Sequence, residues 1–229
     1  MQDYICEVRK AMLGTLYAVG VGPGDPELLT LKAIKTMKDA ECIACPTSHG
    51  SPGLAYQIAA KACPEIVAKE LLLLDFPMRK EDLSEAHQEA AEHLIRPLSS
   101  GKNVAFLTLG DPEFYSTFYY VAEQIKERGY EIEIVAGITS FSAASARRKL
   151  PLAIGDESVK ITFGEYCDFD GTLVILKAGS KLKEIKEHVI ADQRQAYMVE
   201  NCGMLDERVY PDVHSIPDEA GYFSVVVVK

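Results

Sequence analysis

Short apolar runs alternate with segments of helical periodicity over roughly the first 135 residues of the chain. Runs of four to six apolar residues predict buried strands, whereas apolar residues that recur every three or four positions predict helices. We expect strands at 15–20, 41–45, 69–74, 103–108 and 131–135. We expect helices at 26–38, 53–61, 81–96 and 113–128. Strands separated by helices need crossover connections, so this pattern predicts a largely parallel sheet.

The pattern changes after residue 136, where predicted strands outnumber predicted helices. Strands are expected at 158–163, 171–176, 196–200 and 222–228, with helices at 181–190 and directly after Thr139. This favours a second α/β domain with a mixed sheet. We therefore expect an α/β fold of two domains, residues 1–136 and 137–229. Residues 1–13 form a mixed, modestly amphipathic leader that suits a short helix or a loose arm.

Composition and charge narrow the classes of function. A hydrophobic content of 48% is ordinary for a soluble globular protein, and a net charge of −10 argues against non-specific nucleic-acid binding. The longest apolar runs, such as 71–74 and 225–228, are too short to cross a bilayer. The early Asp3, followed by no apolar segment, argues against a secretory signal. We expect a cytoplasmic protein that binds neither nucleic acid nor membrane.

The six cysteines include one Cys-x-x-Cys pair, Cys42 and Cys45. Because the pair lies on a predicted strand at an odd spacing, its two side chains should point to opposite faces. No second pair completes a zinc site. The sequence thus predicts buried free thiols and no metal centre.

A glycine-rich turn follows the first predicted strand and reads Gly20-Val21-Gly22-Pro23-Gly24-Asp25-Pro26. Residues without a Cβ allow another backbone or a ligand to approach closely. The turn lacks the Gly-Lys-Ser/Thr of a Walker A loop and the third glycine of a Rossmann fingerprint. Asp25 suits a helix N-cap and Pro26 the first helical position. Glycine spacing alone is compatible with a ligand loop and with a purely structural turn.

The tetrapeptide Gly-Asp-Pro-Glu at 24–27 recurs at 110–113, again after an apolar strand. Asp111 and Pro112 are therefore also expected to open a helix. In an open parallel sheet both turns would lie at the carboxyl ends of strands, where ligands bind. We expect a binding cleft there, with two well-capped helices as the structural alternative.

Three motifs follow one another along the chain. The first is Gly20-x-Gly22-Pro23-Gly24-Asp25 with Leu28-Leu29-Thr30-Leu31-Lys32-Ala33, the second is Gly110-Asp111-Pro112, and the third is Gly137-Ile138-Thr139-Ser140, preceded by Ala136 and followed by Ala143-Ala144. In this order, the motifs resemble those of the tetrapyrrole methylase family. The family comprises S-adenosyl-L-methionine-dependent C-methyltransferases of corrinoid and sirohaem synthesis. The segment 108–118 and the ending 222–227 are similar to the subgroup that methylates carbon C20. The resemblance implies a homodimer and a cofactor cleft between two α/β domains.

The resemblance also implies contacts with the cofactor S-adenosyl-L-methionine, whose product is S-adenosyl-L-homocysteine. These contacts carry over to Pro23, Leu109, Gly110, Asp111, Phe114, Thr139 and Ser140, and in the C-terminal domain to Lys177 and Cys202. The chain departs from the family at Ala136, where a proline is usual. It departs from some sirohaem-branch members at Pro46, where an aspartate serves as base, so no catalytic base carries over.

Methyl transfer from a sulfonium to a ring carbon needs alignment and exclusion of water more than a strong acid or base. An anionic tetrapyrrole carries many carboxylates, so cations should line its site. The basic clusters are Arg147-Arg148-Lys149 and Arg79-Lys80, each of which also suits a solvated surface. The candidate substrate contacts are Gly22, Gly24, Asp25, Tyr115 and Arg147.

Several of these residues have structural alternatives. Asp111, Thr139 and Ser140 also suit helix caps, and Tyr115, expected on one helical face with Phe118 and Tyr119, also suits a core. Three other activities remain open: methylation of another tetrapyrrole position, methylation of ribosomal RNA or a modified histidine, and non-catalytic nucleotide binding. The acidic balance weighs against RNA. No sequence feature indicates whether the macrocycle already carries cobalt.

Overall fold

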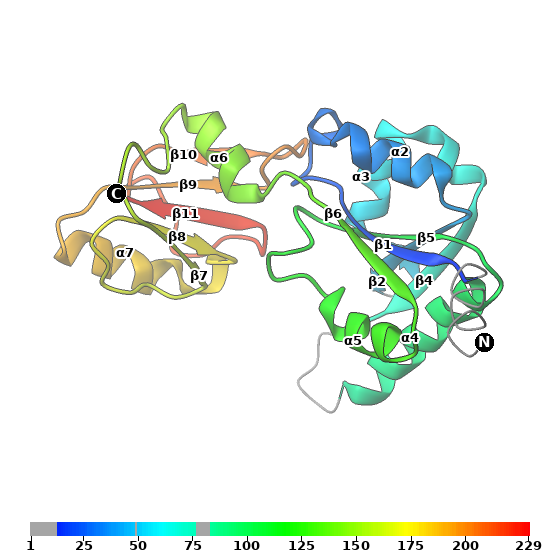
Figure 1. The fold of residues 1–229 in the computed structure, drawn as a ribbon. Helices are drawn as coiled ribbons and strands as arrows, with labels where there is room; N and C mark the ends of the chain where they lie inside the picture. The colour runs from blue at the N-terminus through cyan, green and yellow to red at the C-terminus, as the bar shows by residue number, and fades with distance from the viewer. Residues whose placement is uncertain (1–12, 49, 77–82) are drawn as a thin grey trace. The chain divides into compact units, whose positions relative to one another are not determined.

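The computed structural model describes residues 13–48, 50–76 and 83–229, which form two units (Figure 1). The first unit contains the residues up to Gly22 together with Pro26–Ile138, and the second contains Pro23–Asp25 and Thr139–Lys229. The chain therefore changes unit at 22/23, at 25/26 and at 138/139. The expected division after residue 136 stays a prediction. The three residues in the middle of the glycine-rich turn group with the second unit.

A six-stranded sheet forms the centre of the first unit. Its strands are β1 (Thr15–Gly20), β2 (Cys42–Ser48), β3 (Ser51–Pro52), β4 (Glu70–Asp75), β5 (Val104–Thr108) and β6 (Glu131–Val135). The order is β3-β2-β5-β1-β6, with β4 also paired to β2. Every pair is parallel except β2 with the short β3, which confirms the predicted parallel sheet.

Helices cover both faces of this sheet (Figure 1). They are α2 (Leu31–Asp39), α3 (Leu54–Ala62), α4 (Ser84–Ser99) and α5 (Tyr119–Glu127), with short 3-10 helices η1 (Pro26–Leu28) and η2 (Pro64–Ala68). Helices α4 and α5 pack on the face that carries Phe106, and α2 and α3 pack on the face that carries Leu107. Cys42 lies in the first of these cores and Cys45 in the second, which confirms their opposite orientations.

Two helix starts differ from the prediction. Helix α2 begins at Leu31 rather than after Asp25, because Thr30 is its N-cap and accepts a hydrogen bond from the Ala33 N–H at 3.1 Å. Helix α5 begins at Tyr119 rather than at residue 113. The left-handed backbone of Gly110 (φ 74°) and Tyr115 (φ 50°) prevents a helix across residues 110–118.

The second unit is built on a five-stranded mixed sheet, as predicted. Its strands are β7 (Val159–Phe163), β8 (Thr172–Leu176), β9 (Ala196–Glu200), β10 (Arg208–Tyr210) and β11 (Ser224–Val228), in the order β10-β9-β11-β8-β7. Only β7 and β8 are parallel neighbours. Helix α7 (Leu182–Ala191), preceded by the 3-10 helix η3 (Gly179–Lys181), packs on one face, and α6 (Ser140–Arg148) lies over the other (Figure 1).

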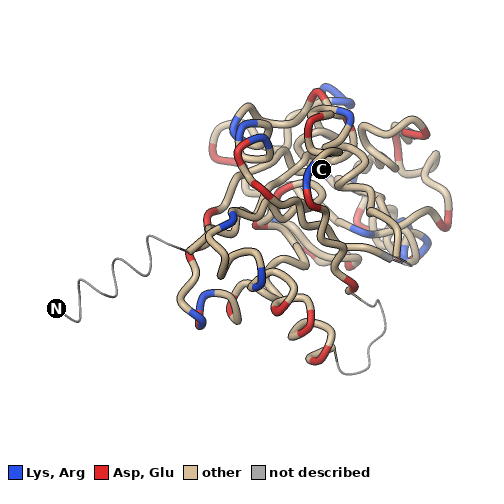
Figure 2. The backbone as a smooth tube through the Cα atoms, turned by 90° about the vertical axis from the view of Figure 1, so that its right-hand side faces the viewer, with Lys and Arg blue, Asp and Glu red and all other residues tan. Residues whose placement is uncertain are grey.

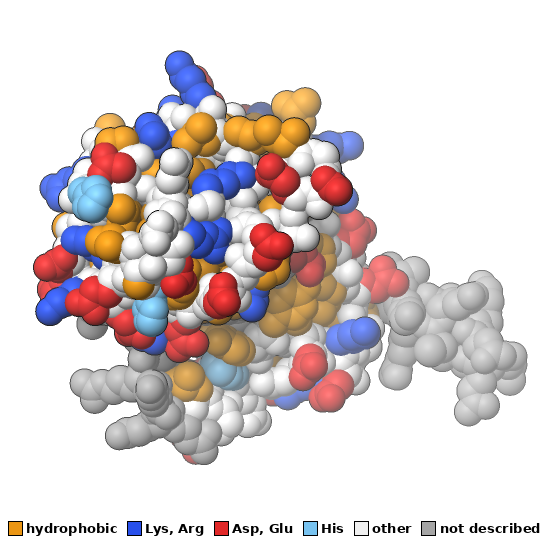
Figure 3. Space-filling model, turned by 90° about the vertical axis from the view of Figure 1, so that its left-hand side faces the viewer, with side chains coloured by type: hydrophobic (Ala, Val, Ile, Leu, Met, Phe, Trp, Pro, Cys, Tyr) orange, Lys and Arg blue, Asp and Glu red, His pale blue; other side chains and the backbone are white. Residues whose placement is uncertain are grey.

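Charged residues of both signs are interspersed along the backbone, with acidic positions more numerous (Figure 2). The face of the second unit in Figure 3 likewise mixes basic, acidic and hydrophobic side chains. Exposed ion pairs such as Lys38–Glu65, at 2.7 Å, contribute little to folding because water screens them. Across the described ranges, no helix combines the length and apolar character that a membrane span requires.

Candidate functional site

Four glycines meet at the carboxyl ends of β1, β5 and β6, and we call this group the glycine junction: Gly20, Gly22, Gly110 and Gly137. Gly22 and Gly110 exchange two backbone hydrogen bonds, with N···O distances of 3.2 and 2.8 Å. A Cβ on Gly20 would lie 2.7 Å from both the Gly110 carbonyl oxygen and the Gly137 Cα. The three loops thus approach one another so closely that a Cβ does not fit at Gly20 or Gly137. Gly22 and Gly110 instead have a positive φ of 73° and 74°, which favours glycine.

Asp111 ties two of these loops together. Its side chain is buried, with 8% of its surface exposed, and each carboxylate oxygen accepts a backbone hydrogen bond at 2.8 Å. Oδ1 accepts from the Glu113 N–H and Oδ2 from the Gly137 N–H. The predicted role as N-cap of a long helix is therefore wrong, because the carboxylate is used across loops. Two of its four acceptor positions remain for further donors.

Thr30 makes a second link within the first unit. Besides capping α2, its hydroxyl donates to the Ala136 carbonyl at 3.4 Å. Thr30 belongs to the first motif and Ala136 directly precedes the third, so the hydroxyl joins the two motifs. Ala136 stands where the resemblance leads us to expect proline, and its carbonyl still takes part in this contact.

The segment after Asp111 exposes several aromatic rings. Phe114, Tyr115 and Tyr119 are 41%, 50% and 45% exposed, whereas Phe118 is fully buried. Tyr115 lies in a turn, so the predicted helical face shared by Tyr115, Phe118 and Tyr119 is wrong. The Tyr119 hydroxyl donates to Glu113 Oε1 at 2.8 Å, and this hydrogen bond raises the pKa of Tyr119. A tyrosine held at positive φ costs about 1 kcal/mol or more and is typical of functional turns.

Ser116 anchors this turn to the sheet. Its Oγ lies 2.9 Å from Thr108 Oγ1 at the end of β5 and accepts a hydrogen bond from the Phe118 N–H at 3.1 Å. Thr108 is itself buried. Ser116 therefore fixes the path of the chain between the glycine junction and α5.

In the second unit, the loop Pro23–Asp25 rests on the segment 202–204. A Cβ on Gly24 would lie 2.6 Å from the Cys202 carbonyl oxygen, so an alanine does not fit there. Arg147 Nη2 lies 3.7 Å from Asp25 Oδ2, and Arg147 Nε donates to Glu207 Oε2 at 3.1 Å. The same Glu207 oxygen accepts from the Gly203 N–H at 2.6 Å.

Cys202 is buried beside this ion network, with 4% of its surface exposed. Burial, with a smaller contribution from Glu207, raises the pKa of the Cys202 thiol to about 11. The side chain is therefore a neutral thiol at pH 7 and not an activated nucleophile.

We expect Cys202 in the folded protein to resist alkylation by iodoacetamide at pH 8, because the reactive thiolate is scarce and the sulfur is buried. The half-buried Cys167 serves as the internal comparison. Mass-spectrometric mapping after brief labelling should show Cys167 modified before Cys202, and denatured protein should label at both. Rapid labelling of Cys202 in the native state would contradict this environment.

Thr139 and Ser140 begin helix α6. Thr139 is its N-cap, and its Oγ1 accepts from the Ser142 N–H at 3.4 Å and lies 2.9 Å from Ser142 Oγ. The capping role that the sequence allowed for Thr139 is thus present in the structure. The contact of Thr139 and Ser140 with the cofactor stays a prediction.

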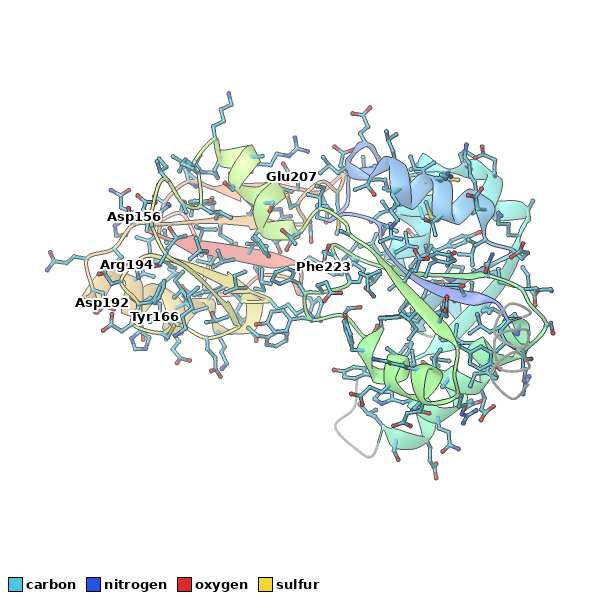
Figure 4. All side chains as sticks on the ribbon, in the orientation of Figure 1. Asp156, Tyr166, Asp192, Arg194, Glu207 and Phe223 are labelled. Carbon is cyan, nitrogen blue, oxygen red and sulfur yellow. The ribbon has the colours of Figure 1, made fainter. Side chains whose placement is uncertain are left out.

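Lys177 lies between two aromatic rings at one end of the second sheet. Its Nζ is 4.9 Å from the centroid of the Phe163 ring and 4.8 Å from that of Tyr222. Its backbone is left-handed (φ 55°), and its N–H donates to the Ser224 carbonyl at 3.0 Å. Tyr222 also contacts Phe223 edge-on at 5.2 Å (Phe223 is labelled in Figure 4). Cation–π contacts of this kind contribute about 0.5–1 kcal/mol each at exposed sites.

The structure sorts the predicted site residues into two sets. Those of the first unit surround or follow the glycine junction: Gly22, Leu109, Gly110, Asp111, Phe114 and Tyr115. Those of the second unit are Pro23, Gly24, Asp25, Thr139, Ser140, Arg147, Lys177 and Cys202. The basic pair Arg79-Lys80 lies outside the described residues.

The other members of the Arg147 cluster have structural roles. Arg148 donates to the Pro211 carbonyl at 3.3 Å and places its guanidinium 5.6 Å from the centroid of Tyr197. Lys149 ends α6 in a left-handed conformation. Sequence reasoning missed Glu207, Phe163 and the role of Gly203. Although Gly203 and Glu207 are only four residues apart, Arg147 and Asp25, which they also contact, are far away in the sequence, so no local signal marks the network.

A separate hollow of about 530 Å³ lies in the second unit and contains none of the predicted site residues. Its lining includes Asp168, Asp170, Arg194 and Lys229. Arg194 donates to the Phe169 carbonyl at 3.0 Å and also to that of Gly171, so its guanidinium holds backbone together (Figure 4). Within the ranges that the structure describes, no three His, Cys, Asp or Glu side chains are grouped so as to hold a metal ion.

Comparison with known proteins shows what the chain resembles. The family model for tetrapyrrole (corrin/porphyrin) methylases matches residues 15–215. A probable cobalt-precorrin-2 C(20)-methyltransferase of Methanocaldococcus jannaschii is 35% identical, over 93% of this chain and 95% of the relative. A precorrin-2 C(20)-methyltransferase of Sinorhizobium sp. is 30% identical, over 94% of this chain and 95% of the relative.

Solved structures share the fold. The X-ray structure of a cobalt precorrin-4 methyltransferase has a TM-score of 0.71 at 23% identity and covers 93% of this chain and 94% of its own. The uroporphyrin-III C-methyltransferase of Thermus thermophilus, in complex with S-adenosyl homocysteine, has a TM-score of 0.70 at 23% identity. The match covers 94% of this chain and 97% of the Thermus chain.

Proposed function

The chain belongs to the tetrapyrrole (corrin/porphyrin) methylase family, and we propose that it methylates C20 of precorrin-2 or cobalt-factor II in cobalamin biosynthesis. The observation that carries this proposal is the match to relatives named for C20 methylation, which extends over more than nine-tenths of both chains. The relatives' names include forms with and without cobalt, so both substrates belong to the proposal.

The proposed methyl donor is S-adenosyl-L-methionine, leaving as S-adenosyl-L-homocysteine. In the first unit we propose that Leu109, Gly110, Asp111 and Phe114 contact it, and in the second unit Pro23, Thr139, Ser140, Lys177 and Cys202. Asp111 supports this because its buried carboxylate keeps acceptor positions that suit the donor's ammonium group. The complex of a relative with S-adenosyl homocysteine supports the cofactor class.

The sulfonium of the donor supplies an electrophilic methyl group when it is bound. The residues of the chain would then align the methyl with the ring carbon and exclude water. Proposed substrate contacts are Gly22, Gly24, Asp25 and Tyr115, of which Tyr115 offers an exposed ring for the macrocycle. Both oxygens of the buried Asp111 hold backbone N–H groups, which suits a binding role better than that of a general base.

The proposal includes a cytoplasmic homodimer. The dimer is carried over from the resemblance to the tetrapyrrole methylase family. Sedimentation velocity at micromolar concentration should give the mass of a dimer, about twice 25.2 kDa.

Anaerobic incubation with methyl-labelled S-adenosyl-L-methionine tests the reaction. Cobalt-factor II, metal-free precorrin-2 and uroporphyrinogen III are offered in separate tubes. Cobalt-factor II is the substrate if cobalt enters the ring before this methylation, and precorrin-2 is the substrate if cobalt enters later. Uroporphyrinogen III is the substrate of the sirohaem branch. We expect one methyl group at C20 of one of the first two, located by NMR. Transfer to uroporphyrinogen III alone would overturn the C20 proposal. We do not expect that transfer, because Pro46 stands where some sirohaem-branch members have their aspartate base.

A further inference from the structure

The loop Pro23–Asp25 is held on the second unit by a four-residue ion and hydrogen-bond network. From this geometry we infer that Glu207 and Arg147 are positioning residues that set the place of this loop, and that Arg147 does not bind the carboxylates of the substrate. The inference rests on the proposed function, and it adds Glu207, which no motif singles out.

The network runs from Gly203 through Glu207 and Arg147 to Asp25. Glu207 Oε2 accepts both from the Gly203 N–H, at 2.6 Å, and from Arg147 Nε, at 3.1 Å. Arg147 then reaches Asp25 Oδ2 with its Nη2 at 3.7 Å. The side chains of Asp25 and Glu207 are 29% and 21% exposed, so they are partly shielded from water. Glu207 is the hub, because it contacts both the backbone of 202–204 and the cation (Figure 4).

Backbone packing alone gives the loop Pro23–Asp25 few contacts that would fix its position. Gly24 lies against the Cys202 carbonyl, and a Cβ on Gly203 would come within 3.1 Å of Asp25 Cβ. Two glycine backbones thus lie against each other with few side-chain atoms to lock them. Gly203 also has a positive φ of 79°, and the hydrogen bond from its N–H to Glu207 fixes that turn.

The loop is covalently continuous with the glycine junction. Gly22 precedes Pro23 directly, and Gly22 exchanges two hydrogen bonds with Gly110 in the first unit. A shift of Pro23–Asp25 therefore pulls on Gly22 and on the turn that carries the proposed cofactor contacts Gly110 and Asp111. Misplacement by about 1 Å can cost orders of magnitude in rate.

The positive charge of Arg147 already faces two carboxylates of the chain itself. Its guanidinium, with one positive charge, is positioned between two carboxylates, so the three side chains together carry a net charge of about −1 and do not attract an anionic macrocycle. A ligand carboxylate at Arg147 would have to compete with both. The consequence of removing Arg147 should therefore fall on the cofactor rather than on the tetrapyrrole.

The variants E207Q and R147Q, their double variant, and R147K test the inference in the full-length protein. We expect E207Q and R147Q each to raise the KM for S-adenosyl-L-methionine and weaken S-adenosyl-L-homocysteine binding about tenfold, with the tetrapyrrole KM unchanged. The double variant should be no worse than either single one, because both break one network. R147K, which keeps the charge, should recover part of the loss.

R208Q is the matched control, since Arg208 is the adjacent exposed residue and undergoes the same chemical change. It should behave as wild type. Hydrogen exchange of peptides covering residues 20–28 and 200–205, without ligand, should quicken in E207Q and R147Q but not in R208Q. A rise in the tetrapyrrole KM in R147Q with E207Q unaffected would overturn the inference and make Arg147 a substrate ligand.

The two proposals fail separately. A wild-type protein that binds S-adenosyl-L-homocysteine but methylates no tetrapyrrole would overturn the proposed function, while the binding and exchange series would still decide the positioning role. Unchanged loop exchange in both E207Q and R147Q would overturn the positioning role even if the enzyme is a C20-methyltransferase.

Discussion

Replacement of Gly137 with alanine is expected to abolish methyl transfer and to lower the free energy of unfolding by about 3 kcal/mol, the upper range for overpacking. The new Cβ would overlap the Gly110 carbonyl oxygen and lie 2.9 Å from the Gly20 Cα. All of these atoms are backbone, so no side chain can turn away to make room. To relieve this overlap, the loop after β6 must move away from the ends of β1 and β5, which disrupts the glycine junction.

Gly129→Ala is the control for Gly137→Ala. Gly129 has a φ of 86° but nothing within 4 Å of its Cβ position. Alanine there carries only the backbone cost of about 1–2 kcal/mol, and activity should persist. Urea denaturation and initial rates on both variants separate crowding at the junction from loss of a glycine in general. A stable and fully active Gly137→Ala protein would show that the junction is not closely packed in solution.

Replacement of Asp111 with alanine should lower the free energy of unfolding by about 1–3 kcal/mol, because the partly buried N–H groups of Glu113 and Gly137 lose a charged acceptor. Methyl transfer should fall by about 100-fold, equivalent to about 2.7 kcal/mol. Asp111→Asn keeps one acceptor oxygen, so it should regain part of the stability. If the carboxylate also pairs with the donor's ammonium, Asp111→Asn will bind S-adenosyl-L-methionine more weakly than wild type even though it regains stability.

Asp156→Asn, an exposed carboxylate labelled in Figure 4, is the control for Asp111→Asn and should leave both stability and rate unchanged. Urea denaturation gives the stability difference, and calorimetric titration with S-adenosyl-L-homocysteine gives the affinity. An Asp111→Ala protein within 0.5 kcal/mol of wild type, the usual range for surface changes, would contradict the account of the two hydrogen bonds.

The sequence predicted strands and layers well because these follow from burial along a single segment. Each of the five strands predicted from 15–20 to 131–135 lies within three residues of its expected bounds, and the mixed second sheet also follows from its apolar runs. The short edge strands β3 and β10 were not predicted. Helix starts were predicted less well. The Asp-Pro pairs at 25 and 111 are local capping signals, but tertiary hydrogen bonds recruit Asp111 to Gly137, and Thr30 takes over the cap of α2.

The candidate site shows the same division. Motif glycines mark where the loops converge, because close backbone approach leaves a trace in residue type. The partners of those loops leave none. Glu207 lies 182 positions after Asp25, and Lys177 is placed between rings from two different parts of the chain. Such contacts depend on how distant segments pack, which local periodicity does not encode.

Hydrogen exchange of the wild-type protein with and without saturating S-adenosyl-L-homocysteine tests the location of the site most directly. The account predicts slower exchange in peptides covering 20–25, 108–115 and 137–142, the three motif segments. Protection confined to the hollow lined by Asp168, Asp170 and Arg194, with the motif segments unchanged, would contradict it.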